Sequence, residues 1–319
     1  MDKREIGASG LKVYPFCLGG NVFGWTADEK QSFAVLDGFI DAGLEFIDTA
    51  NVYSTWGPGH KGGESETVIG NWLKKSGKRD KVIIATKVGK PMGDGKKGLS
   101  RKYITRAIED SLKRLQTDYI DLYQSHEDDP NTPLLETMET FTDLVKQGKI
   151  RAIGASNYSG ARLREAISVS LENNLEPYQC MQPEYNLYAR EQYEKEIEPI
   201  CREKNIGVIS YYSLASGFLT GKYRSENDLS QSSRGQGVKK MLDPRGYKIL
   251  ASLDKIAAEY NVTQAAVALA WIMARPGITA PIASATSTKQ LHELLKATGL
   301  KLTGHDIDQL NNASKYNTI

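Results

Sequence analysis

The stretch VIIATK at residues 82–87 decides the expected fold when it is considered with the segments that follow it. It is short, mostly apolar and rich in β-branched residues, which is typical of a strand buried on both faces. The segment SRKYITRAIEDSLKRL at 100–115 repeats apolar residues at three-to-four spacing behind a candidate N-cap, Ser100, and predicts an amphipathic helix. A second apolar run, IDLYQSH, follows at 120–126. The order strand, helix, strand predicts one unit of a parallel sheet with a right-handed crossover.

The same alternation runs through nearly the whole chain. Six further apolar runs occur, at residues 16–20, 45–50, 151–157, 178–186, 207–212 and 278–284. Charge-rich segments of helical length lie between runs, as at 65–78 and at 132–149, where Pro133 and Gly148 mark a helix start and a helix end. Because eight strand-helix repeats close a sheet on itself, we expect an α/β fold, a (β/α)8 TIM barrel, as a single domain over residues 1–319.

Two segments lie outside this repeat. The segment KREIGASGLKVYP at 3–15 has two short runs around a glycine-bearing turn and predicts an N-terminal β-hairpin that caps the lower end of the barrel. The stretch from Leu214 to about Arg245 predicts a long loop at the C-terminal face, and loops of that length are usually functional or mobile. An open doubly wound sheet is the alternative fold, but LGGNVFG at 18–24 lacks the G-x-G-x-x-G spacing that such a sheet needs after its first strand.

The composition favours a chain that binds small ligands. It has 319 residues, of which 40% are hydrophobic and 25% are charged, and a formal net charge of +2. Because nucleic acids and anionic membranes require a concentrated basic face, neither is an expected partner. The cysteines, Cys17, Cys180 and Cys201, lack C-x-x-C spacing. The N-terminal segment MDKREIGASG has no apolar signal core, and no apolar run approaches the ~18 residues that would span a membrane. We therefore expect a cytoplasmic protein, and we make no prediction of its oligomeric state.

Polar side chains end three successive strands of the expected barrel. Asp48 ends the second strand and is followed by Tyr53, whereas Lys87 ends the third strand. His126 ends the fourth. Each residue alone has an ordinary structural interpretation, as a turn cap, a snorkelling side chain or a packing side chain. Because the active site of such a barrel lies at the carboxyl ends of its strands, we expect the four side chains to converge.

Together these residue types meet the requirements of carbonyl reduction. A tyrosine hydroxyl is a poor acid at neutral pH, and a lysine ammonium beside it lowers its pKa. A buried lysine needs a carboxylate to stay charged, and a neutral histidine orients the carbonyl group or passes a proton. Tyr53 is therefore the candidate general acid, with Asp48, Lys87 and His126 as its partners. No metal site is expected, because the sequence has no H-x-x-x-H pattern and no clustered pair of carboxylates.

Several motifs, in order, resemble the aldo-keto reductases, including their bacterial branches and the cytoplasmic β subunits of potassium channels. The motifs are IGASGLKV, FIDTANVY, IIATKVG, YQSH, IRAIGASNYS, YYSLASGFLTGKY and PIASATSTKQLHELL, and together they extend over almost the whole chain. The resemblance implies a (β/α)8 barrel that reduces aldehydes or ketones with NADP(H). It gives Tyr53 the role of general acid, Lys87 and Asp48 that of tuning its acidity, and His126 that of positioning the carbonyl group of the substrate.

The resemblance also implies a cofactor site. The matching residues are Gly20, Asn21, Asp48, Ser156, Asn157, Gln182, Tyr211, Ser213, Leu214, Gly217, Lys222, Ser284, Thr286, Ser287, Gln290 and Glu293. Those before Ser213 match contacts around the nicotinamide, with Tyr211 stacking on its ring. The segment from Ser213 to Lys222 matches the loop around the pyrophosphate, where small residues let backbone N–H groups approach phosphate oxygens.

The adenine end departs from the pattern of many relatives. Ser284 and Gln290 stand where lysine and arginine are common, so hydroxyls, a helix N-terminus and Lys289 would hold the 2′-phosphate. NADP(H) is favoured over NAD(H), because an NAD-specific site is expected to place an acid against the ribose 2′-hydroxyl.

Aromatic residues near the expected mouth are candidate walls for a small carbonyl substrate. These are Trp25, Trp56 and Tyr158, although each has packing as an alternative role. Two other functions stay open at this point. One is a cofactor-sensing module with little turnover, as in the potassium-channel β subunits. The other is a barrel aldolase in which Lys87 forms a Schiff base with its substrate.

Overall fold

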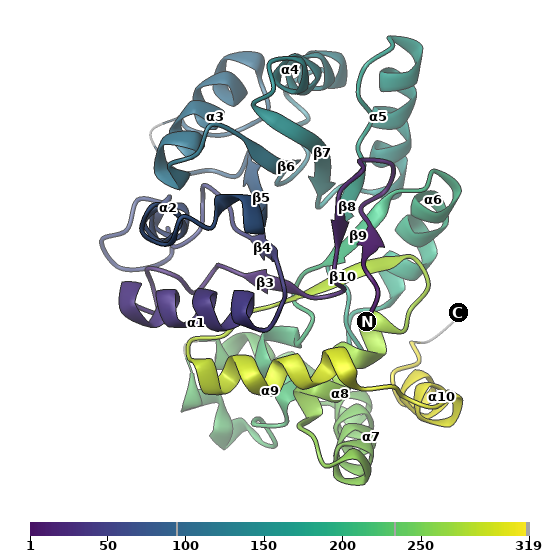
Figure 1. The fold of residues 1–319 in the computed structure, drawn as a ribbon. Coiled ribbons are helices and arrows are strands. Elements are labelled where there is room, and N and C mark those ends of the chain that lie inside the picture. The colour runs from purple at the N-terminus through teal and green to yellow at the C-terminus, as the bar shows by residue number, and fades with distance from the viewer. Residues whose placement is uncertain (94, 233, 317–319) are drawn as a thin grey trace.

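A computed structural model of the chain describes residues 1–93, 95–232 and 234–316. Eight parallel strands close into a barrel in the order β10-β3-β4-β5-β6-β7-β8-β9 (Figure 1). These strands are β3 (Cys17–Gly19), β4 (Phe46–Asp48), β5 (Ile83–Val88), β6 (Ile120–Ser125), β7 (Ile150–Ser156), β8 (Cys180–Gln182), β9 (Gly207–Ser210) and β10 (Ile278–Ala283). Each overlaps one of the eight apolar runs, so the predicted (β/α)8 barrel is confirmed.

Helices surround the barrel and connect its strands (Figure 1). They are α1 (Glu29–Asp41), α2 (Glu64–Ser76), α3 (Arg101–Leu115), α4 (Leu134–Lys146), α5 (Gly160–Glu172), α6 (Glu198–Glu203), α7 (Pro244–Tyr260), α8 (Gln264–Met273), α9 (Thr288–Gly299) and α10 (Gly304–Ala313). The predicted cap of α3 is present, because the Ser100 side chain accepts a hydrogen bond from the Tyr103 backbone N–H. Within the described ranges, no helix is long and apolar enough to cross a membrane.

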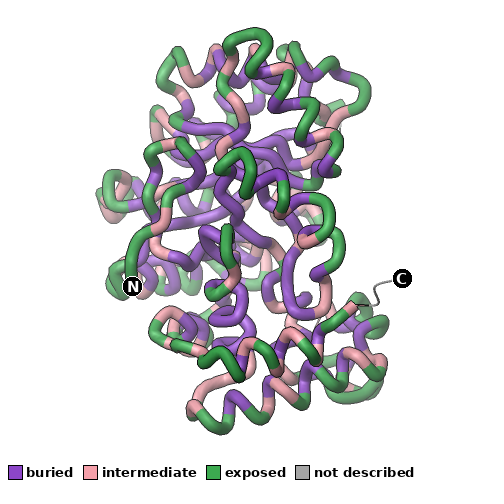
Figure 2. Tube along the Cα trace, turned by 90° about the vertical axis from the view of Figure 1, so that its right-hand side faces the viewer, coloured by how far each residue is buried: buried purple, intermediate pink, exposed green. Residues whose placement is uncertain are grey.

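The core has two parts, and buried residues fill the inside of the molecule (Figure 2). The larger part lies between the strands and the helices. The smaller part fills the lower barrel, where Phe46 and Leu122 pack with Ile6 and Val13 of the N-terminal hairpin. That hairpin pairs β1 (Arg4–Glu5) with β2 (Lys12–Val13) in antiparallel register, as predicted. Because the hairpin closes the lower end, a ligand has access to the barrel only from its C-terminal mouth.

The segment from Leu214 to Arg245 is more ordered than the long loop expected from its polar sequence. It contains the short helices η3 (Ala215–Thr220), η4 (Glu226–Gln231) and η5 (Gly235–Met241). The segment from Leu214 to Arg245 is held because Leu229 and Val238 are buried, and because Arg224 donates two hydrogen bonds to Asp254 of α7, at 2.8 and 2.7 Å.

Elsewhere the chain has a 3-10 turn, η1 (Arg79–Lys81), and a π-helical turn, η2 (Tyr193–Ile197).

Candidate active site

The predicted proton-transfer residues meet at the C-terminal mouth of the barrel. Asp48 ends β4 and Lys87 lies near the end of β5, and the parallel register pairs Asp48 with Ala85 across these strands. Lys87 Nζ donates to Asp48 Oδ2 at 2.7 Å and to the Tyr53 hydroxyl at 2.8 Å. The Tyr53 hydroxyl in turn donates to Asp48 Oδ2 at 3.0 Å. The His126 ring, just beyond β6, packs edge-on against the Tyr53 ring with centroids 6.0 Å apart.

The ion pair at the centre of this group is fully buried and fully hydrogen-bonded. The side chains of Lys87 and Asp48 are 0% and 1% exposed. The third hydrogen bond of Lys87 Nζ goes to the carbonyl oxygen of Thr49 at 2.8 Å, and Gln182 Nε2 donates to Asp48 Oδ1 at 2.9 Å. Burial lowers the pKa of Lys87, and the neighbouring Asp48 carboxylate opposes that effect. Three acceptors around one nitrogen match the three hydrogens of an ammonium, so Lys87 is charged here.

Tyr53 holds its proton more tightly than the sequence predicts. Burial raises the pKa of Tyr53 well above its usual value, and the Asp48 carboxylate raises it further by repulsion and by accepting the phenol hydrogen bond. The sequence predicts that Lys87 lowers the pKa of Tyr53, but the net shift is upward, because burial and Asp48 both disfavour the phenolate. Tyr53 is protonated at neutral pH, which is the state that a proton donor requires. The ammonium 2.8 Å from its oxygen would stabilise the phenolate only after the proton has left.

His126 is neutral in this environment. Burial lowers the pKa of His126 well below its usual value, and the charges of Lys87 and Lys90 lower it further. Its backbone is fixed on both sides, since its N–H donates to the Val88 carbonyl and its own carbonyl accepts from Asn157 Nδ2, both at 2.8 Å. The buried Nδ1 atom of the ring finds no hydrogen-bond partner among the described residues. Because the His126 ring lines the cavity, a neutral, fixed imidazole here suits the orientation of a polar ligand.

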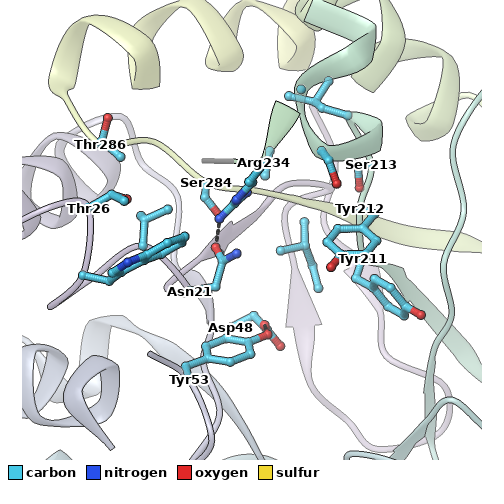
Figure 3. Close-up of a pocket in the computed structure, with 18 of the residues that line it drawn as sticks. Asn21, Thr26, Asp48, Tyr53, Tyr211, Tyr212, Ser213, Arg234, Ser284 and Thr286 are labelled. Carbon is cyan, nitrogen blue, oxygen red and sulfur yellow. Dashed lines mark hydrogen bonds between the residues drawn. The ribbon is translucent and has the colours of Figure 1, made fainter. Parts of the chain in front are cut away.

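A cavity of about 1150 Å³ opens above this group, and Figure 3 shows part of its lining. Tyr53 and His126 line one end, together with the predicted aromatic residues Trp25 and Trp56. Fifteen of the sixteen expected cofactor residues also line the cavity: Asn21, Asp48, Ser156, Asn157, Gln182, Tyr211, Ser213, Leu214, Gly217, Lys222, Ser284, Thr286, Ser287, Gln290 and Glu293. They come from distant parts of the sequence, and several lie at or just beyond the carboxyl ends of barrel strands. The fold therefore gathers them around one space.

The remaining expected cofactor residue, Gly20, lies beside this cavity without lining it. Its N–H donates to the Asp48 carbonyl at 2.7 Å, and its own carbonyl accepts from Ser65 Oγ at 2.7 Å. A Cβ atom at this position would lie 2.9 Å from Ser65 Oγ, which leaves no room for a side chain. The neighbouring Gly19 lines the cavity instead. The backbone of Gly20 is thus held between Asp48 and Ser65, and its contact with a cofactor stays a prediction.

Tyr158 also lies elsewhere than expected. It is 1% exposed, belongs to the core between barrel and helices, and does not line the cavity. Its hydroxyl lies 3.2 Å from that of Tyr178, which lies 2.7 Å from Ser125 Oγ. A chain of buried hydroxyls therefore satisfies its polar end, and Tyr158 is a packing residue instead of a wall of the substrate pocket.

Lys87 does not line the cavity, because Tyr53 and Asp48 lie between its side chain and the open space. Its nitrogen has no free direction toward a ligand. This arrangement is unfavourable for the aldolase alternative, since a Schiff-base lysine must reach the carbonyl carbon of its substrate. The position suits a residue that acts through Tyr53.

Sequence reasoning missed several lining residues. The guanidinium of Arg234, between η4 and η5, lies over the Trp25 ring at 5.6 Å, and Arg234 is among the residues around the cavity in Figure 3. Tyr212 has a left-handed backbone, with φ of 51°, and its ring packs edge-on against Tyr211 at 5.1 Å. Lys90 lies three residues beyond Lys87 and also lines the cavity. Of these three residues, only Lys90 could have been recognised from the sequence, because it is a charged residue just beyond the end of a predicted strand.

The lining is suited to a nicotinamide dinucleotide. Ala215, Ser216 and Gly217 have successive positive φ values of 48°, 56° and 95°, which make a tight left-handed turn. The N–H groups of Ala215 and Gly217 donate to the carbonyl oxygens of Tyr212 and Leu214 within this turn, which brings Ser216 and Gly217 to the cavity. A Cβ on Gly217 would lie 3.0 Å from Lys222 Cε, so glycine allows the lysine to approach. Hydroxyl and amide side chains line the opposite end. Among the described residues, no group of three His, Cys, Asp or Glu side chains is placed to hold a metal ion.

Fold and site thus define a (β/α)8 barrel protein with a buried group of tyrosine, lysine and aspartate at its mouth, and comparison with known proteins identifies its family. The model of the Aldo/keto reductase family matches residues 15–315. Two Bacillus subtilis proteins, "Uncharacterized oxidoreductase YrpG" and "Aldo-keto reductase YhdN", are each 36% identical, and the matches cover 98% and 96% of this chain and 95% and 90% of theirs. A rice protein named "Probable voltage-gated potassium channel subunit beta" is 33% identical over 93% of this chain and 91% of its own. The chain belongs to the aldo/keto reductase family, a class of oxidoreductases that in general use nicotinamide cofactors.

Proposed function

We propose that the protein reduces aldehydes or ketones to alcohols with NADPH and that Tyr53 is the general acid. The observation that carries this proposal is the buried triangle of Tyr53, Lys87 and Asp48 beneath a cavity lined with amides, hydroxyls and lysines. When bound, NADPH supplies the hydride. The carbonyl oxygen of the substrate gains negative charge as the carbon is reduced, and it then takes the proton of the Tyr53 hydroxyl.

Three neighbouring residues, Lys87, Asp48 and His126, assist this proton transfer. Lys87 lies 2.8 Å from the phenol oxygen and stabilises the phenolate that forms. Asp48 keeps the lysine charged and fixes its direction. His126, which is neutral and lines the cavity, orients the carbonyl group of the substrate above Tyr53.

The other end of the cavity would hold the dinucleotide. Lys222 and Lys289 line it and, among the described residues, form no ion pair within 4.0 Å, so their charge is available to phosphate groups. Arg234 also lines the cavity, where its guanidinium lies over the Trp25 ring. The Ser287 side chain caps α9, accepting a hydrogen bond from the Gln290 N–H, which leaves other N–H groups of that helix N-terminus for an anion.

The direct test measures cofactor binding and turnover on the purified protein. NADPH and NADH are titrated by fluorescence, and NADPH oxidation is then followed with 4-nitrobenzaldehyde and methylglyoxal. We expect saturable NADPH binding, weaker NADH binding and oxidation that depends on the aldehyde. Absence of turnover across a broad panel of aldehydes and ketones would contradict the reductase proposal.

The preference for NADPH is expected to depend on Lys289. Lys289→Ala should raise the Kd for NADPH about tenfold, because one charged hydrogen bond to the 2′-phosphate is lost, and leave the Kd for NADH nearly unchanged. Lys301→Ala removes the same charge from an exposed residue beyond α9 and serves as the matched control. Parallel changes for the two cofactors would show that Lys289 does not contact the 2′-phosphate.

A second candidate is a cofactor-sensing module with little turnover. It is supported by the relatives in rice and Arabidopsis thaliana named as probable potassium channel β subunits, at 33% and 34% identity. The two candidates share a cofactor site, so binding alone does not separate them. A sensor is expected to bind NADPH tightly, to reduce every tested aldehyde very slowly, and to co-purify with a membrane partner.

We further propose that the protein acts in the cytoplasm. The three cysteines are buried and unpaired, which suits a reducing compartment. Fractionation of the source cells, with detection of the protein by antibody, would test this location. Recovery of the protein outside the cytosolic fraction would contradict it.

A further inference from the structure

One cation of the cavity has no role in the proposed function. Lys90 follows β5 and is partly buried, and it lines the cavity at the end where Tyr53 and His126 lie. Among the described residues it forms no ion pair within 4.0 Å and no hydrogen bond through its ammonium group. Lys90 therefore lines the cavity with no counter-charge among the described residues.

The acidic side chains of the described lining do not neutralise it. Asp48 is already paired with Lys87, and Glu293 accepts two hydrogen bonds from Lys296, both at 2.9 Å. The reaction end of the cavity thus contains one balanced ion pair, the Lys90 ammonium, and the Arg234 guanidinium, which lies over the Trp25 ring at 5.6 Å. The charge of Lys90 acts on the reaction centre: after burial and Lys87, Lys90 is the next cause that lowers the pKa of His126.

The local backbone explains why Lys90 lies in this position. Gly89 has φ of 126°, a conformation that β-carbon-bearing residues rarely adopt, and it turns the chain directly after β5. A Cβ on Gly89 would lie 3.1 Å from Leu99 Cδ2, so the turn also packs closely on the following segment. Lys90 is held beside the mouth by this turn, one residue before Pro91, which also lines the cavity.

The wall near Tyr53 is apolar and aromatic. The Trp56 ring lies 5.9 Å from the Tyr53 ring, and the Trp25 ring packs edge-on against Trp56 at 5.6 Å. Val52 completes this side. A ligand that fits here has an apolar body against the tryptophans, a carbonyl group at Tyr53, and a group that complements an unpaired ammonium.

We propose that Lys90 binds an anionic group of the substrate, so that the physiological substrate is a carbonyl compound bearing a carboxylate or a phosphate. The inference rests on the proposed function and specifies its substrate class. An anion next to Lys90 replaces the missing counter-charge in a partly desolvated site, where a charge-assisted hydrogen bond is stronger than in water. A neutral aldehyde leaves the ammonium unpaired and gains nothing from it.

The test compares each anionic substrate with a neutral counterpart of similar shape. One pair is 4-carboxybenzaldehyde and methyl 4-formylbenzoate, and the other is glyceraldehyde 3-phosphate and glyceraldehyde. For the wild-type protein with NADPH, we expect kcat/KM to favour the anionic member of at least one pair by about tenfold, mainly through KM. The pair that shows this preference distinguishes a carboxylate from a phosphate substrate.

Variants then assign the preference to the lysine. Lys90→Gln should bring the ratio of kcat/KM for the anionic and the neutral substrate close to one. Lys90→Glu should reverse the preference, and Lys90→Arg should retain it. Lys97→Gln changes the same charge at an exposed position that does not line the cavity, and is expected to keep the wild-type ratio.

Two failures are distinguishable in this experiment. Turnover of neutral aldehydes with no preference for the anion, or a preference that survives Lys90→Gln, overturns the inference and leaves the reductase proposal standing. No turnover of any of the four aldehydes overturns both. Loss of the preference in Lys90→Gln together with its retention in Lys97→Gln supports the inference.

Discussion

Tyr53→Phe is expected to lower kcat/KM for aldehyde reduction by a factor of about 10²–10⁴, the usual contribution of a positioned general acid. The change removes one oxygen atom and keeps the ring that packs against Trp56 and His126. The Kd for NADPH should stay within a few fold of the wild-type value, because the hydroxyl contacts Asp48 and Lys87 and would contact the substrate. Fluorescence titration and steady-state NADPH oxidation measure the two quantities separately.

Tyr158→Phe provides the matched control for this experiment. It makes the same chemical change in a tyrosine whose hydroxyl bonds to Tyr178 inside the core. We expect it to lower stability by about 1 kcal/mol, the usual effect of losing one buried hydrogen bond, and to leave turnover close to wild type. Equal loss of cofactor binding and turnover in Tyr53→Phe would show that Tyr53 is a structural residue and that the general acid lies elsewhere.

The barrel and the position of its proton-transfer group could be predicted because both depend on local patterns. A strand that is buried on two faces has a short apolar run as its sequence, and the carboxyl ends of all the strands of a closed barrel lie at one mouth. Asp48, Lys87 and His126 each lie within one residue of such an end, so their convergence follows from the fold. The distances then depend only on parallel register, which the barrel fixes.

Other features depend on contacts between distant segments and left little trace in the sequence. Tyr158 lies two residues beyond the end of β7, where a substrate contact is expected, but its ring packs against Tyr178 in the core. Arg234 reaches the cavity because the segment between η3 and η5 folds back over the mouth, which its polar composition does not predict. The direction of the Tyr53 pKa was mispredicted for a related reason: its burial depends on the three-dimensional enclosure of the hydroxyl, which neighbouring residue types do not reveal.

Lys87→Met is expected to lower the free energy of unfolding by about 3–5 kcal/mol, because it leaves the buried Asp48 carboxylate without its counter-charge. Asp48 is 1% exposed and would retain hydrogen bonds from Tyr53 and Gln182, which do not neutralise it. Methionine approximates the length and the apolar stem of lysine, so the loss reflects the charge more than a cavity. Chemical denaturation followed by circular dichroism gives the difference from the wild type.

The double variant Lys87→Met/Asp48→Asn separates the unpaired charge from the other effects of the substitution. Asparagine keeps the shape of the aspartate and an acceptor for Tyr53 but carries no charge. We therefore expect the double variant to be more stable than Lys87→Met alone by about 1–3 kcal/mol, although both should lack reductase activity, since neither has the ammonium beside the Tyr53 oxygen. A single variant as stable as the wild type would mean that the ion pair is not maintained in solution. Such a result would also remove the physical basis for Lys87 as the group that stabilises the Tyr53 phenolate.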